Sequence, residues 1–239
     1  ICCVAVSSFV ILKNLREDKE QEQTFKELIE IIENNEEDKS ENKGKIDLLS
    51  LYKINNDLIG WIRIENTSLN YPVVQSKIKN YYLRKDFYKN YSSYGTPFLA
   101  EKCNINTSEN LIIYGHHIIN DKMFGCLEKY KSKEFYEENK IINFYTLNGE
   151  ETISTKYEIF AVFKTVVYTD NDFKYYNYTD FNSETEFESF INKVQSISMY
   201  NTGIIPKYGD KFITLSTCEY SNKNGRLVVI ARNVENEEV

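Results

Sequence analysis

Two apolar, β-prone runs near the C-terminus constrain the fold of this chain more than any other feature. The first run ends at Cys218, the second opens at Arg226, and a polar loop containing Asn224 and Gly225 lies between them. This pattern predicts a β-hairpin. Because the end of one hairpin strand lies beside the start of the next, we expect Cys218 and Arg226 to be neighbours. A thiol beside a fixed positive charge is a candidate activated nucleophile.

The composition indicates one sizeable domain with appendages. The chain has 239 residues, of which 41% are hydrophobic and 14% aromatic, enough for a large core rich in β structure. Residues 17–41 hold eleven acids and three lysines, a net charge of −8, which leaves about +1 for the rest of the chain. No basic surface for nucleic acid is indicated, so we expect no nucleic-acid partner.

The cysteines and histidines do not indicate a metal site. The five cysteines (Cys2, Cys3, Cys103, Cys126 and Cys218) show no CxxC spacing, and the chain has two histidines. These residues do not form a convincing zinc set, and we expect no cofactor. A disulfide between Cys103 and Cys126 is the alternative to our interpretation of them as small buried hydrophobic residues.

Residues 1–12 form an apolar run that ends before Lys13 and Arg16. Twelve residues are too few to span a bilayer, which needs about 20. We interpret the run as the end of a single-pass membrane anchor in a chain cut from a longer one. A buried core helix is the alternative.

Residues 13–45 are predicted to contain an acidic amphipathic helix followed by a linker at 41–44. Phe25, Leu28, Ile29 and Ile32 recur at helical spacing and form one narrow apolar stripe. We expect the stripe to pack on the domain, with binding to a partner as the alternative.

Residues 46–235 are predicted to form a mostly β domain, with residues 236–239 as a tail. Several short strands with a few inserted helices are typical of a partly closed β-barrel. The expected strands cover residues 58–64, 69–74, 95–100, 111–114 and 157–167 besides the hairpin, and helices are expected near 46–52, within 121–139 and from 183.

Both histidines follow an apolar strand, in the sequence Tyr114-Gly115-His116-His117. Such strand ends hold a side chain rigidly yet leave it open to solvent. A pair of surface histidines is the alternative. Together with Cys218 and Arg226, however, an imidazole completes the requirements of cysteine catalysis: a nucleophile, an acid for the leaving amine and a charge for the oxyanion.

These motifs together resemble those of the sortases, and of class B in particular. The resemblance covers residues 46–235 and rests on Tyr-Gly-His-His at 114–117, Thr-Leu-Ser-Thr-Cys-Glu at 214–219 and the segment that starts at Arg226. It implies an eight-stranded β-barrel with inserted helices and an N-terminal helix. It also implies an enzyme anchored in the cell membrane of Gram-positive bacteria, with its catalytic domain extracellular.

The resemblance assigns three catalytic roles. Cys218 is the nucleophile, His116 the general acid and base, and Arg226 the residue that holds the substrate backbone and the oxyanion. Sequence alone does not rank His116 above His117, but the family's pattern selects the histidine that follows glycine. Arg232 is the rival of Arg226, and it lies about 20 Å further along the strand.

The resemblance also suggests that Ser216, Thr217 and Glu219 help to line the substrate groove. Ser216 shares the strand face of Cys218, whereas Thr217 points the other way and would contribute its backbone. Tyr220 stands where some class B members have an acidic residue, so no further carboxylate is expected there. The aromatic loop at 168–182 is the segment expected to determine the substrate motif.

The implied reaction is a two-step acyl transfer without a cofactor. The thiolate attacks a threonine carbonyl in the C-terminal sorting signal of a secreted surface protein, and the amine of a peptidoglycan peptide then resolves the thioester. One alternative is a cysteine peptidase that transfers the acyl group to water. The other is a non-catalytic surface binding module in which Cys218 is merely buried.

Overall fold

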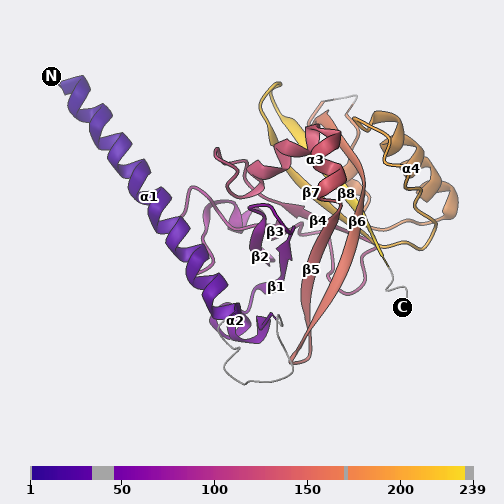
Figure 1. Cartoon of the computed structure of the whole chain (residues 1–239), viewed down its shortest axis with the longest axis horizontal. Helices are drawn as coiled ribbons and strands as arrows, with labels where there is room; N and C mark the ends of the chain where they lie inside the picture. Colours follow the sequence, from indigo (N-terminus) through magenta and orange to yellow (C-terminus); the bar gives the residue numbers. More distant parts are fainter. Residues whose placement is uncertain (1, 34–45, 170–171, 235–239) are drawn as a thin grey trace.

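The computed structural model describes residues 2–33, 46–169 and 172–234, and its centre is a closed β-barrel (Figure 1). The strands neighbour one another in the order β1-β2-β3-β4-β7-β8-β6-β5, and β5 pairs with β1 to close the barrel. This architecture confirms the predicted eight-stranded barrel. The strands are β1 (Leu58–Arg63), β2 (Asn70–Val74), β3 (Phe98–Leu99), β4 (Asn110–Tyr114), β5 (Ile141–Asn148), β6 (Glu151–Val166), β7 (Phe212–Glu219) and β8 (Gly225–Asn233).

Helices surround the barrel and fill its longer connections. The sequence signal for α4 is a serine cap: the Ser183 hydroxyl accepts a hydrogen bond from the Glu186 main-chain N–H at 3.2 Å. The Glu186 carboxylate in turn accepts from the main-chain N–H of Asn182. The helices are α1 (Cys2–Glu33), α2 (Leu48–Ile54), η2 (Tyr81–Arg84), η3 (Phe124–Lys131), α3 (Lys133–Glu138), η4 (Tyr175–Asn177) and α4 (Glu184–Ile197).

Three neighbouring strands bring distant parts of the sequence to one rim of the barrel. β4 and β7 pair in parallel, so both end at the same rim, and the antiparallel β8 begins there. Apolar side chains with no exposed surface anchor each strand in the core, among them Ile113 of β4, Leu215 of β7 and Val229 of β8. The loop that follows β4 therefore emerges beside the β7–β8 hairpin.

Helix α1 lies on the side of the barrel formed by β1–β3 (Figure 1). Its apolar stripe belongs to the hydrophobic core of the barrel. Leu28 and Ile32 are almost fully buried, and the ring of Phe25 meets the ring of Tyr71 edge to face, with 4.9 Å between centroids. Burial of such a stripe, rather than helix propensity, supplies most of the stability of a helix in a protein.

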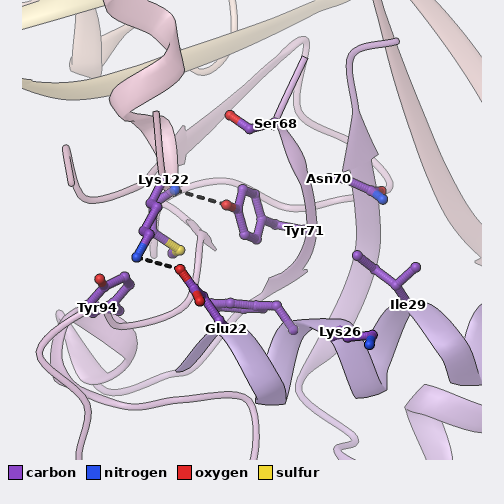
Figure 2. A pocket seen from close by; sticks show the side chains of 10 residues that line it. Glu22, Lys26, Ile29, Ser68, Asn70, Tyr71, Tyr94 and Lys122 are labelled. Carbon is purple, nitrogen blue, oxygen red and sulfur yellow. Dashed lines mark hydrogen bonds and ion pairs between the residues drawn. The ribbon is translucent and has the colours of Figure 1, made fainter. Parts of the chain in front are cut away.

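A cavity of about 240 Å³ lies between α1 and β2 (Figure 2). Glu22 of α1 forms an ion pair of 2.6 Å with Lys122, which belongs to the loop after β4. The hydroxyl of Tyr71 accepts a hydrogen bond from the main-chain N–H of Met123 at 3.0 Å. The N-terminal helix and β2 thus both contact the loop that carries the two histidines.

The structure corrects the prediction of a membrane anchor. Within the described residues, no helix combines the length and the apolar character needed to cross a membrane. The physical reason is that helix α1 (Cys2–Glu33) continues directly from apolar residues into charged ones, and it contains no apolar stretch of the roughly 20 residues that a span needs. The extracellular location inferred from that anchor loses its support.

Two other predictions fall on residues that the structure does not describe: the linker at 41–44 and the tail at 236–239. A further difference concerns β5, which the sequence analysis does not predict. β5 pairs along its whole length with the first half of β6, and a turn at Gly149 with φ of 63° joins the two strands. This hairpin supplies the strand that closes the barrel against β1.

Candidate active site

Cys218 and Arg226 face each other across the β7–β8 hairpin. They are direct partners in the antiparallel register, which confirms the prediction that they are neighbours. Cys218 is half-buried, and within the described part of the chain its thiol forms no disulfide. The guanidinium of Arg226 is also partly exposed, and its Nη1 donates a hydrogen bond of 2.8 Å to the main-chain oxygen of Gly225. The hairpin therefore presents a thiol and a fixed cation at the rim.

The register between β4 and β7 brings a histidine to the same rim. Tyr114, the last residue of β4, stands opposite Ser216 in the parallel pairing. His116 follows two residues after Tyr114, and Cys218 follows two residues after Ser216, so both lie at the same end of the β4–β7 pair.

A main-chain carbonyl fixes the orientation of the His116 ring. His116 Nε2 lies 2.8 Å from the main-chain oxygen of Leu83, which belongs to η2. A carbonyl oxygen only accepts hydrogen bonds, so Nε2 carries a hydrogen and donates it. In the neutral ring Nδ1 is then the nitrogen free to accept a proton. The carbonyl of Leu83 thus selects the tautomer of His116.

The surroundings of His116 favour its neutral form. Burial lowers the pKa of His116 from its ordinary value, and the nearby positive charge of Arg84 lowers it further. The hydrogen bond to Leu83 opposes both effects but does not outweigh them. At neutral pH, the neutral imidazole with a basic Nδ1 is the dominant form.

The loop that carries His116 is fixed by contacts on both sides. A Cβ on Gly115 would lie 2.5 Å from the fully buried ring of Phe124, so the position requires glycine. The main-chain N–H of Phe124 donates to the His116 oxygen at 2.9 Å. Met123 adopts a φ of 53°, an unusual conformation for a bulky side chain, and its bond to Tyr71 holds it there.

The three predicted groove residues are buried and have internal partners. The hydroxyls of Ser216 and Tyr175 lie 2.7 Å apart, and the Thr217 hydroxyl donates to the Gly115 oxygen at 2.8 Å. Glu219 is only 5% exposed and pairs with two lysines. A direct role of Ser216, Thr217 and Glu219 in substrate binding therefore stays a prediction.

Glu219 lies at the centre of an ionic network next to Cys218. Lys131 of η3 approaches its carboxylate to 2.9 Å, and Lys164 of β6 approaches to 3.3 Å. Burial acts to raise the pKa of Glu219, but hydrogen bonds from Ser221 and both lysines outweigh it and lower the pKa to about 2. Glu219 is therefore a fixed negative charge that ties the hairpin to η3 and β6.

Two contributors to the site, the Leu83 carbonyl and Tyr175, are not singled out by the sequence. The Leu83 carbonyl belongs to the backbone and leaves no side-chain signal. Tyr175 falls within the aromatic loop at 168–182, and burial raises its pKa to about 12.

Tyr220 projects beyond Cys218 with 72% of its surface exposed. Arg232, the rival of Arg226, stands at the far end of β8, where it pairs with Glu158 and Asp210.

Within the ranges that the structure describes, no group of three or more His, Cys, Asp or Glu side chains is arranged to hold a metal ion. The arrangement at the rim instead offers a thiol, a proton acceptor and a fixed cation. These are the groups required for acyl transfer through a thioester.

Comparison with known proteins identifies the family. A family model described as a sortase domain matches residues 62–234. The chain is also 36% identical to sortase B of Staphylococcus aureus over 189 residues, which are 78% of this chain and 74% of that relative. The chain belongs to the class B sortases. It is therefore a sortase-type cysteine transpeptidase, an enzyme that transfers an acyl group through a cysteine.

Solved class B structures share the whole architecture. The S. aureus sortase B–substrate complex is 30% identical and superposes with a TM-score of 0.78, over 92% of this sortase and 99% of that chain. A sortase B complexed with triglycine is 31% identical, with a TM-score of 0.76 over 93% and 99% of the two chains. Both superpositions extend well beyond the matched domain model and include the region of the N-terminal helix.

Proposed function

We propose that this sortase cleaves a C-terminal sorting signal after threonine and transfers the acyl part to a peptide amine, with Cys218, His116 and Arg226 as its catalytic residues. The observation that carries the proposal is the pairing of Cys218 with Arg226 at the rim where His116 also emerges. A thiol, an oriented imidazole and a guanidinium together match the chemistry of acylation.

In the first step, Nδ1 of neutral His116 takes the proton of the Cys218 thiol, and the sulfur attacks the threonine carbonyl carbon to form a carbon–sulfur bond. Arg226 stabilises the negative charge that develops on the carbonyl oxygen. The carbon–nitrogen bond then breaks, and protonated His116 delivers a proton to the departing amine. Because Nε2 donates to Leu83, Nδ1 is the nitrogen that gives and regains this proton.

In the second step, the acceptor amine attacks the thioester carbonyl. His116, now neutral, takes a proton from the attacking nitrogen, and the thiolate of Cys218 leaves. Return of this proton from His116 to the Cys218 sulfur restores the enzyme, and the cycle needs no oxidant, reductant or cofactor. The lowered pKa of His116 supports this base role, since the ring is ready to accept a proton at neutral pH.

The substrates are proposed by analogy with relatives. A sortase B of S. aureus has been solved as a complex with its substrate, and another sortase B with triglycine, which carries a free amine. We therefore propose a sorting-signal peptide as acyl donor and a cell-wall peptide with a free amino group as acceptor. The exposed Tyr168 and Tyr220 border the rim and are available to contact a peptide.

A product assay tests the proposal. The enzyme is incubated with a library of threonine-containing sorting peptides, with and without triglycine, and the products are identified by mass spectrometry. We expect a peptide–triglycine conjugate that forms with the wild type and is absent with Cys218→Ala. Cleavage that never incorporates triglycine would contradict transpeptidation and favour the peptidase.

A further inference from the structure

We propose that His117 is a positioning residue for the nucleophile, acting through the main-chain carbonyl of Cys218. The inference deepens the proposed function and rests on Cys218 being the nucleophile. His117 is the neighbour of the proposed acid and base, and its side chain is only 14% exposed. Its Nδ1 lies 2.9 Å from the Cys218 oxygen, and the carbonyl can only accept, so Nδ1 carries the hydrogen and donates it.

The imidazole of His117 takes the place of a strand partner that β4 no longer provides. The Ser216 oxygen points toward β4 and accepts from the main-chain N–H of Gly115 at 3.2 Å. Main-chain groups two residues apart point to the same side of a strand, so the Cys218 oxygen faces that side too. β4 has already ended at Tyr114, and the donor at this position is the side chain of His117.

His117 also holds the residue beyond the nucleophile. Its ring packs against the ring of Tyr220, with centroids 4.9 Å apart and planes tilted by 51°. The Tyr220 hydroxyl donates a hydrogen bond of 3.2 Å to the His117 oxygen. His117 therefore contacts the hairpin on both sides of Glu219, at Cys218 and at Tyr220.

A carboxylate lies near the same ring nitrogen. Oε1 of Glu128 is buried 3.8 Å from His117 Nδ1, and among the described residues it has no hydrogen-bond partner. The other oxygen of Glu128 pairs with Lys131, which also binds Glu219. A series of charged contacts therefore runs from Glu219 through Lys131 and Glu128 to His117. It connects Glu219 and His117, the two residues that hold the hairpin turn.

The consequence for catalysis is geometric. The carbonyl of Cys218 belongs to the peptide that sets the direction of the Cys218 side chain. If that peptide rotates, the sulfur moves relative to Arg226 and to Nδ1 of His116. A displacement of about 1 Å in an active site can cost about 100-fold in rate.

The test compares His117→Leu, which fills similar space without a donor, with His117→Asn, whose side-chain amide can donate from the position of Nδ1. We expect His117→Leu to lower kcat by about 10- to 100-fold with little change in KM, and His117→Asn to recover most of the loss. Rates are normalised to the folded fraction measured by circular dichroism.

A spectroscopic readout reports the hydrogen bond directly. Cys218-Glu219 is the one Cys-Glu step in the sequence, so labelling cysteine carbonyls with carbon-13 and glutamate nitrogens with nitrogen-15 gives a single three-dimensional NMR correlation from this peptide. We expect the Cys218 carbonyl resonance to move upfield in His117→Leu, as a lost hydrogen bond requires, and to return toward its wild-type position in His117→Asn.

Each outcome distinguishes the two claims. An unmoved carbonyl resonance in His117→Leu, an unchanged kcat, or a His117→Asn variant no better than His117→Leu would overturn the positioning role alone. A wild-type enzyme that forms no acyl adduct on Cys218 would overturn the proposed function, and the positioning role with it.

Discussion

At the level of single residues, the neighbours of Cys218 on β7 are buried, and each stabilises a different part of the rim. Ser216 meets Tyr175, Thr217 binds the backbone before His116, and Glu219 binds Lys131 and Lys164. These contacts explain why polar residues follow one another in a strand that is otherwise apolar: each buried polar group has a partner. Cys218, the proposed nucleophile, is partly open to solvent.

The network around Glu219 predicts a specific response to acid. The pKa of Glu219 is about 2 in the folded protein, below the value of about 4.3 of an unfolded chain. Its ionised form therefore stabilises the fold fully above about pH 4.3, and this contribution is lost as the pH falls toward 2. We expect Glu219→Gln to reduce the free energy of unfolding by about 1–2 kcal/mol at pH 7.

Urea unfolding at pH 7, 4 and 3 measures this contribution. The difference between the wild type and Glu219→Gln should shrink as the pH falls. Glu150→Gln, at an exposed turn, is the control and should show no such trend. A difference that stays constant from pH 7 to pH 3 would show that the carboxylate of Glu219 is not held in its ionised form by the lysines.

At the level of elements, the sequence predicts structures that depend on neighbouring residues better than those that depend on distant ones. The β7–β8 hairpin is predicted because its turn and its apolar runs are close in sequence, and the α4 cap is a four-residue signal. β5 escapes prediction although Asn148-Gly149 is a turn signal, because the strand mixes polar and apolar residues without clear alternation. The carbonyl that orients His116 is a product of loop geometry and leaves no trace in the identity of Leu83.

The N-terminal helix gives a prediction at this scale. Leu28 of α1 has no exposed surface, so Leu28→Ala removes buried methyl groups and leaves a cavity. We expect a loss of about 2–5 kcal/mol in the free energy of unfolding. Glu27→Ala, on the exposed side of the same helix, is the matched control and should change it by less than about 0.5 kcal/mol.

Thermal and urea unfolding of the two variants decides whether α1 is part of the cooperative domain. If Leu28→Ala behaves like Glu27→Ala, the helix contributes no stability to the barrel, and its contacts with Tyr71 and Lys122 do not hold it in place.

At the level of the whole molecule, the pairing of strands that are distant in sequence assembles the site. His116 and Cys218 lie far apart in the sequence, and the parallel pairing of β4 with β7 brings their loops to one rim. No local signal encodes this pairing, so the sequence could supply the three residue types but not their geometry. The family resemblance was needed to predict that these three residues belong to one site. The register of β4, β7 and β8 explains how their strands meet at one rim.

The most direct measurement is to locate the acyl group on the enzyme. Wild type, Cys218→Ala and Arg226→Ala are mixed with a sorting peptide without acceptor, quenched in acid, and mapped by peptide mass spectrometry. We predict a thioester on Cys218 in the wild type, none in Cys218→Ala, and formation slowed by about 100- to 1,000-fold in Arg226→Ala. An acyl group on another residue, or peptide cleavage by Cys218→Ala, would contradict the assignment of Cys218 as the nucleophile.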